Sequence, residues 1–234
     1  MQGRTLYGGA SALIAYTAAI RAFSDLPPLR SAQIAFVAPI GGEVELRREI
    51  VREGRNVVQV RSEVWVEGQC ALTAFFLFGT EREPNARHPV PKPADWPGPP
   101  AEAEQVMADK GPAFIQSNFE LRRAQRPGGD GSPTVARWLR LKDHGTLDPI
   151  SELVLVGDTM PPGAMRAMER QGPISSINWS FNLLTETPRT SDGWWLAENA
   201  SEWADNGYSS ERLRLWNRDG EQMLSGLQCV AVFG

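Results

Sequence analysis

Few side chains in this 234-residue sequence are suited to acid–base or nucleophilic chemistry. It has two histidines: His88 precedes a proline, and His144 lies in the turn-like sequence Asp-His-Gly, so both are expected at the surface. No GxSxG nucleophile elbow, HExxH pair, phosphate-binding glycine loop or His/Cys cluster occurs. Serine-hydrolase, metal-dependent and nucleotide-dependent chemistry is therefore disfavoured, and we expect no cofactor and no metal. A carboxylate with polar helpers remains.

Gln228 is the most telling polar residue, because it interrupts the apolar run from Leu227 to Phe233. A glutamine in a buried strand must find partners or cost about 1–3 kcal/mol. A purely structural hydrogen bond would also satisfy it. Cys70 and Cys229 lie in apolar runs as well and are expected to be buried free thiols.

Asp158 and Ser176 each have an ordinary structural explanation. Asp158 is followed by two prolines and precedes a helix predicted at about 163–170, where it could simply be the N-cap. Ser176 alternates with Asn178, Ser180 and Asn182, which could be the solvated face of a strand.

The positioning elements are predicted from hydrophobic spacing and turn residues. An alanine-rich helix is expected at 10–23. Strands are expected at 31–39, 43–52, 57–66, 71–78, 114–123, 135–142, 175–184, 193–201, 208–217 and 222–233.

The two halves of the sequence repeat each other. Residues 31–36 align with 176–181, and both halves end on Phe-Gly. The offset between these ends pairs Gln228 with Thr73, and the first half has no acid where its helix begins. One site, in the second half, is therefore expected. A helix followed by an antiparallel meander predicts an α+β double hotdog, with two antiparallel sheets each wrapped around a central helix.

A proline-rich stretch divides the halves. Seven prolines between residues 83 and 100 exclude a helix interior or central strand. We predict an N-terminal hotdog at 1–82, a linker at 83–111 that includes a short helix at 101–109, and a C-terminal hotdog at 112–234.

The ordered motifs resemble the acyl-CoA thioesterase II (TesB-like) double-hotdog family over essentially the whole chain. They are Gly8-Gly9, Phe36-Val37-Ala38-Pro39, Arg52-Glu53-Gly54-Arg55, Trp138-Leu139-Arg140, Asp158 before Pro161-Pro162, Ser176-Ile177-Asn178-Trp179, Asp192-Gly193-Trp194-Trp195 and Gln228. The resemblance implies hydrolysis of an acyl thioester to free acid and thiol without a covalent intermediate. Asp158 would activate a water that Ser176 and Gln228 hold. Ser176 stands where well-studied members carry threonine.

Two alternatives stay open: a non-catalytic acyl-thioester-binding hotdog protein, and a hydratase or dehydratase, which usually needs a histidine paired with an acid. The expected partner is acyl-CoA or a related acyl thioester, with a role in lipid metabolism.

A formal charge of −4 and a pI of about 5.4 argue against nucleic acid and anionic membranes as partners. A cytoplasmic location follows by default. Exposed sheet edges and tryptophans (Trp194, Trp195, Trp203, Trp216) leave a homodimer open.

Overall fold

The computed structural model describes residues 5–90, 92, 98–99, 111–124 and 133–233. The described strands form one antiparallel sheet of ten strands, in the order β2-β3-β4-β1-β7-β10-β9-β8-β6-β5. The elements are α1 (Gly8–Ala22), β1 (Leu29–Phe36), β2 (Glu45–Glu53), β3 (Val57–Val66), β4 (Gln69–Gly79), α2 (Ala113–Asn118), β5 (Phe119–Arg123), β6 (Thr134–Leu141), α3 (Pro149–Gly157), η3 (Gly163–Arg166), β7 (Ile174–Leu183), η4 (Ser191–Gly193), β8 (Trp195–Asp205), β9 (Tyr208–Asn217) and β10 (Gln222–Val232).

The single sheet differs from the two sheets expected. The halves join through β1 and β7, which pair antiparallel from Ser31↔Asn182 to Ala35↔Asn178. Each of these strands would otherwise present an edge of unpaired backbone N–H and C=O groups, and their pairing removes both edges. The α+β class and the antiparallel strands are as predicted.

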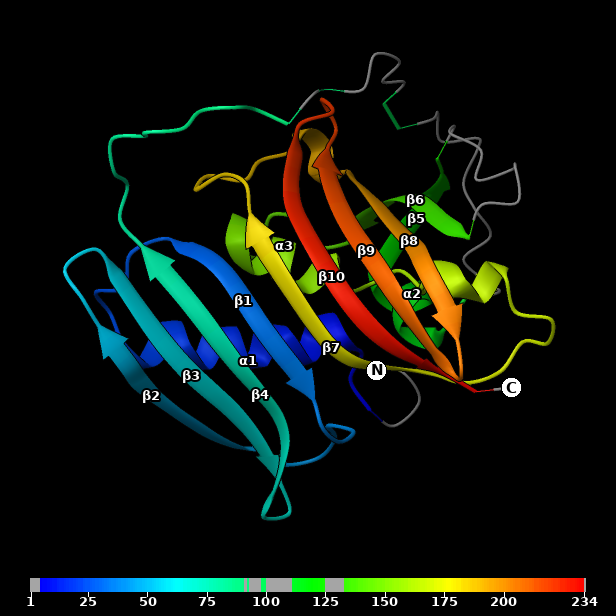
Figure 1. The fold of residues 1–234 in the computed structure, drawn as a ribbon, viewed down its shortest axis with the longest axis horizontal. Coiled ribbons are helices and arrows are strands. Elements are labelled where there is room, and N and C mark those ends of the chain that lie inside the picture. Colours follow the sequence, from blue (N-terminus) through cyan, green and yellow to red (C-terminus); the bar gives the residue numbers. More distant parts are fainter. Residues whose placement is uncertain (1–4, 91, 93–97, 100–110, 125–132, 234) are drawn as a thin grey trace.

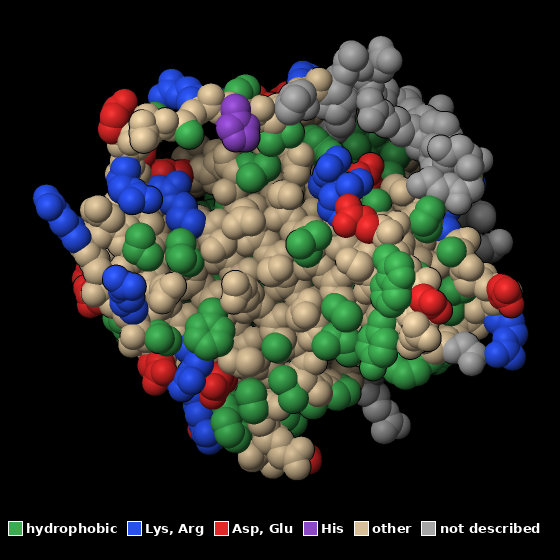
Figure 2. Space-filling model, viewed as in Figure 1, with side chains coloured by type: hydrophobic (Ala, Val, Ile, Leu, Met, Phe, Trp, Pro, Cys, Tyr) green, Lys and Arg blue, Asp and Glu red, His purple; other side chains and the backbone are tan. Residues whose placement is uncertain are grey.

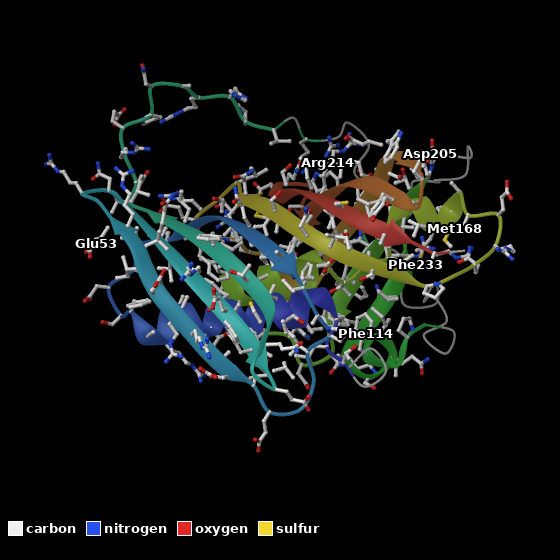
Figure 3. All side chains as sticks on the ribbon, turned by 60° about the horizontal axis from the view of Figure 1, so that its bottom comes forward. Glu53, Phe114, Met168, Asp205, Arg214 and Phe233 are labelled. Carbon is white, nitrogen blue, oxygen red and sulfur yellow. The ribbon has the colours of Figure 1, made fainter. Side chains whose placement is uncertain are left out.

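The helices lie on one side of this sheet. Figure 1 shows α1 behind the strands of the first half, with α3 beside it behind the second half. Small side chains allow α1 to approach the strands closely, since Ala12, Ala15 and Ala19 have no exposed surface. The buried Ser62 hydroxyl on β3 donates to the Ala15 carbonyl at 2.8 Å. In Figure 3, Phe114 lies on this inner side, whereas Arg214 projects from the outer side.

Two elements of the second half were predicted wrongly. Residues 114–118, expected in a strand, belong to the helix α2. The helix predicted at about 163–170 is only the short 3-10 turn η3, and the main helix α3 lies before Asp158. The missed signal is Asp148-Pro149: the Asp148 carboxylate accepts hydrogen bonds from the backbone N–H groups of Ile150 and Ser151, and Pro149 occupies the first helical position.

The predicted linker is described only in part. Residues 81–90 are exposed, and the short helix predicted at 101–109 lies outside the described residues. The domain boundaries at 82 and 112 therefore stay a prediction. No helix in the described ranges has the length and apolar character needed to cross a membrane.

The outer face of the sheet is mixed in character. Figure 2 shows scattered hydrophobic side chains there and charged side chains mostly toward the rim. Of the four tryptophans that suggested a homodimer, Trp194, Trp195 and Trp216 are buried within the chain, and Trp203 is exposed. Cys70 and Cys229 are free but half-exposed rather than buried, because both side chains lie at outward positions of their strands.

Gly157 ends α3 against the indole of Trp179, which is fully buried. A Cβ at position 157 would lie 2.7 Å from that ring. We expect Gly157→Ala to lower the free energy of unfolding by about 1–3 kcal/mol, because a packed core yields little space for an added methyl. Urea unfolding measures this. Gly54→Ala is the matched control, since the nearest atom there lies at 3.4 Å; equal stabilities of the two variants would contradict the prediction.

Candidate active site

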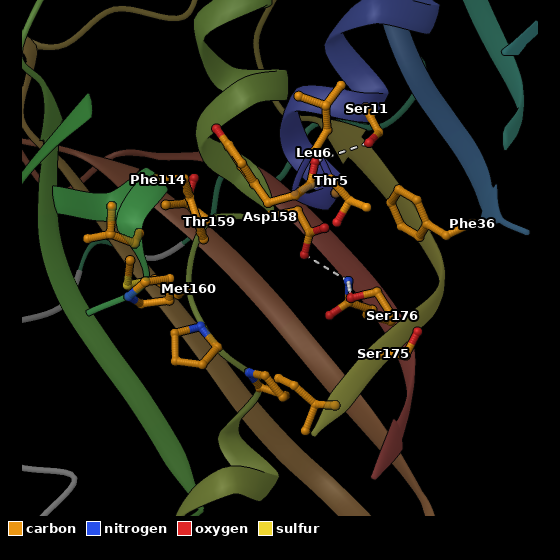
Figure 4. Close-up of a pocket in the computed structure, with 18 of the residues that line it drawn as sticks. Thr5, Leu6, Ser11, Phe36, Phe114, Asp158, Thr159, Met160, Ser175 and Ser176 are labelled. Atoms are coloured by element: carbon orange, nitrogen blue, oxygen red, sulfur yellow. Dashed lines mark hydrogen bonds between the residues drawn. The ribbon is translucent and has the colours of Figure 1, made fainter. Parts of the chain in front are cut away.

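The structure brings Asp158, Ser176 and Gln228 together on the inner side of the sheet. The Gln228 amide nitrogen donates to Asp158 Oδ1 at 2.8 Å and to Ser176 Oγ at 3.0 Å (Figure 4). Asp158 follows α3, Ser176 belongs to β7 and Gln228 to β10, so three separate elements place them. Their catalytic role stays a prediction at this point.

Asp158 is not a helix N-cap, as one interpretation of the sequence held. It is the C-cap of α3, and its backbone N–H bonds to the Val156 carbonyl. The chain beyond it is fixed by two buried polar residues that sequence reasoning missed. Asn199 donates to the carbonyls of Met160 and Pro161 at 2.9 and 3.2 Å. The Glu211 carboxylate accepts from the Gly163 backbone N–H at 2.7 Å.

Glu211 could have been noticed in the sequence. It alternates with Ser209, Leu213 and Leu215 along β9 and therefore falls on the inward face of the strand. An acid at such a position must find donors. Here its carboxylate accepts from the backbone N–H groups that begin η3, where a negative charge is favoured.

Burial dominates the electrostatics of Asp158. The residue is 8% exposed. Desolvation raises its pKa from 3.8 to about 7, and the hydrogen bond from Gln228 opposes that rise. The other carboxylate oxygen faces the start of α1, since a Cβ on Gly8 would lie 1.8 Å from Asp158 Oδ2. Only a glycine leaves this space, and the positive end of the α1 dipole also favours the ionised form.

Ser176 reaches the site because of a β-bulge. The β7–β10 register shifts between Cys229↔Asn178 and Val230↔Ser176, which leaves Ile177 without an opposite residue. Trp179 and Ser176 therefore both point inward, while Ile177 and Asn178 are exposed. The simple alternation expected for Ser176 and Asn178 is wrong, because an extra residue reverses which face each later side chain takes.

The first half has no equivalent site. Ile34 aligns with Trp179, and their partners in the neighbouring strands are Ala74 and Gln228. Ala74 is thus the structural counterpart of Gln228, one residue from the Thr73 expected. An alanine there has no amide to bridge a carboxylate and a hydroxyl.

A cavity of about 950 Å³ opens beside the three residues. Its wall is apolar where Tyr7, Phe114 and Met160 line it, and Tyr7 stacks on Phe114 with ring centroids 4.3 Å apart. The Tyr7 hydroxyl donates to the Leu155 carbonyl at 3.1 Å, and burial raises the pKa of Tyr7 well above its usual value. Its hydroxyl therefore stays protonated beside the site.

The two histidines do not belong to this cavity. His88 is exposed, and the His144 ring nitrogen Nδ1 lies 3.3 Å from the Leu141 carbonyl in a turn. Neither lines the wall. In the part of the chain that the structure describes, no three His, Cys, Asp or Glu side chains group in a way that could hold a metal ion.

Two family models together match nearly the whole chain. The model of the acyl-CoA thioesterase N-terminal domain matches residues 1–79, and that of the C-terminal domain matches residues 84–232. A search of curated proteins gave no significant match.

Several solved structures share the fold. A hot dog protein of unknown function from Alicyclobacillus acidocaldarius has a TM-score of 0.85 at 20% identity, covering 99% of this chain and 88% of that one. A tesB protein from Mycobacterium avium subspecies paratuberculosis has a TM-score of 0.78 at 18% identity, with 100% and 90% covered. Acyl-CoA thioesterase II TesB2 from Mycobacterium marinum has a TM-score of 0.73 at 18% identity, with 97% and 88% covered. With both halves matched by its domain models, the chain belongs to the acyl-CoA thioesterase family, a family of thioester hydrolases.

Proposed function

We propose that this protein hydrolyses an acyl-CoA to free acid and coenzyme A with a water that Asp158 activates. One observation carries the proposal: a single glutamine amide bridges a buried carboxylate and a serine hydroxyl at the wall of a cavity that is partly apolar. A base, a group to hold the water and room for an acyl chain are what direct thioester hydrolysis requires.

The pKa of Asp158 suits it to this task, because a general base works best when its pKa lies near the operating pH. The water oxygen forms a bond to the thioester carbonyl carbon as its proton passes to Asp158. The tetrahedral intermediate then expels the thiolate, which takes the proton back from Asp158. Ser176 Oγ and Gln228 Oε1 can hold the water, since the Gln228 amide protons already point at Asp158 and Ser176.

The start of α1 can stabilise the developing oxyanion. Its N-cap Tyr7 supplies no side-chain hydrogen bond, and the glycines at positions 8 and 9 carry no side chain to shield the first backbone N–H groups. Such N–H groups favour negative charge. The first half of the chain would in this way complete a site whose side chains come from the second.

The hydratase or dehydratase alternative loses its support, because neither histidine lines the cavity. A non-catalytic binder on the same fold remains the second candidate. Release of free thiol from a panel of acyl-CoAs separates it from a hydrolase.

Asp158→Asn should lower kcat about 10²–10⁴-fold, since the amide keeps the shape but cannot take a proton. KM should change little, because the proton transfer matters mainly in the transition state. Steady-state thiol release measures both constants. Asp205→Asn, at the exposed end of β8, is the control and should retain full activity. Unaltered hydrolysis by the Asp158 variant would exclude this base.

The rate should depend on pH through the same carboxyl. Because the ionised form is the base, kcat/KM should rise with pH, reach half its limit near pH 7 and then level off. The hydrogen bond from Gln228 lowers the pKa of Asp158, so Gln228→Leu should move the midpoint to higher pH as well as slow the reaction. A pH–rate profile of both proteins tests this; identical midpoints would contradict it.

Stability should show the opposite dependence. The pKa of Asp158 is higher in the folded protein than the usual 3.8, so the folded state binds this proton more tightly than the unfolded chain. Its contribution is therefore fully present below about pH 4 and is lost as the pH rises to about 7. At pH 8 we expect Asp158→Asn to be about 2–4 kcal/mol more stable than the wild type.

Urea unfolding at pH 8 and pH 5 checks this prediction. The advantage of Asp158→Asn should shrink substantially at pH 5, whereas Asp205→Asn should track the wild type at both values. A constant difference between wild type and Asp158→Asn would show that the pKa of Asp158 is not raised.

A further inference from the structure

Two arginines line the wall of the cavity away from Asp158, and a third, the exposed Arg123, lies next to them. Arg123 and Arg137 lie directly opposite each other in the β5–β6 ladder. Arg166, in η3, donates to the Thr134 carbonyl at 3.1 Å and so lies beside the start of β6. Arg137 and Arg166 both line the cavity. We call these three residues the arginine cluster.

The cluster has no carboxylate to balance it within the described ranges of the chain. None of the three arginines takes part in an ion pair there, whereas the neighbouring cross-strand pair Glu120↔Arg140 does, at 2.8 Å. Like charges directly opposite on adjacent strands are destabilising. An arrangement that repels itself on the wall of a cavity indicates that an anion binds between the cations.

Arg137 is the least expected member of the cluster. It is half-buried on the inward face of β6, in line with the buried side chains of Val135 and Leu139. Burial lowers the pKa of Arg137, and the charges of Arg166 and Arg123 lower it further. Arginine nevertheless stays charged in proteins, and an anion bound between the three side chains would relieve this repulsion.

We propose that the arginine cluster binds the phosphate groups of coenzyme A and thereby holds the carrier end of the substrate. This inference rests on the proposed hydrolysis of an acyl-CoA and names which part of that substrate each end of the cavity takes. Planar guanidinium groups match phosphate oxygens in pairs. Three cationic groups suit the several phosphates of coenzyme A better than the single phosphodiester of a carrier-protein arm.

The spacing of the strands fits this assignment. β7, with Ser176, and β6, with Arg137, are separated by β10, β9 and β8, which is four interstrand spacings or roughly 19 Å along the curved sheet. The curvature makes the direct path shorter. A pantetheine arm has about a dozen bonds between sulfur and phosphate and spans roughly 15 Å when extended. The thioester can therefore lie at Asp158 while the phosphates reach the cluster.

The test compares a substrate that carries the phosphates with one that lacks them. In the Arg137→Gln/Arg166→Gln variant, KM for an acyl-CoA should rise about 10–100-fold, because charge-assisted hydrogen bonds are lost. The kcat for acyl-CoA, and kcat/KM for the same acyl group on pantetheine, should stay within about twofold. Arg55→Gln, in an exposed turn far along the sequence, is the control and should change neither.

Calorimetric binding of free coenzyme A keeps the test independent of hydrolysis. Wild type should bind coenzyme A at least about tenfold more tightly than the double variant, and added salt should shrink that advantage. Equal losses on acyl-CoA and acyl-pantetheine would assign the arginines a structural role and overturn the proposal. Unchanged coenzyme A binding, with weakened action on an acyl carrier protein, would overturn it in favour of that carrier. If the wild type released no thiol from any acyl-CoA but bound coenzyme A through the arginine cluster as expected, the proposed hydrolysis would be refuted and the role of the cluster would stand.

Discussion

The Asp158 carboxyl is held out of water by the end of α3, the start of α1 and the inner face of the sheet, and its only described hydrogen-bond donor is the Gln228 amide. Desolvation raises the pKa of this carboxyl to about 7. The close approach of the two helices depends on residues without side chains, since a Cβ on Gly9 would lie 2.2 Å from the Leu155 carbonyl oxygen. The fold thus maintains a buried acid that reduces its stability at neutral pH.

That arrangement needs both halves of the chain at once. The β1–β7 pairing joins them into one sheet and sets α1 of the first half against α3 of the second. The second half supplies Asp158, Ser176 and Gln228, and the first half supplies the helix end that faces the carboxylate. A duplicated unit has in this way become asymmetric: one copy carries the polar side chains, and the other carries alanine at the matching strand position.

The cavity has two chemically different regions. Tyr7, Phe114 and Met160 give it an apolar wall suited to an acyl chain, while Arg137 and Arg166 give it a cationic one. The buried Glu211 carboxylate and the buried Asn199 amide fix the chain between Asp158 and η3. The position of Arg166, in η3, is therefore tied to the backbone that follows Asp158. Binding of the carrier and activation of water would thus share one rigid segment.

Much of the site could be predicted from the sequence, because a glutamine inside an apolar strand must be paired and because the repeat shows which half carries polar groups. The strand segments and the alanine-rich helix follow from hydrophobic spacing for the same reason: one face of each must be buried. Asp148-Pro149 is a local helix-start signal as well, so the end of α3 at Asp158 could also have been predicted. Tertiary structure alone decided two things. The halves share one sheet because β1 and β7 satisfy each other's edges. Ser176 faces inward because a bulge at Ile177 reverses the alternation, and a bulge arises from pairing with a distant strand, which local spacing does not encode.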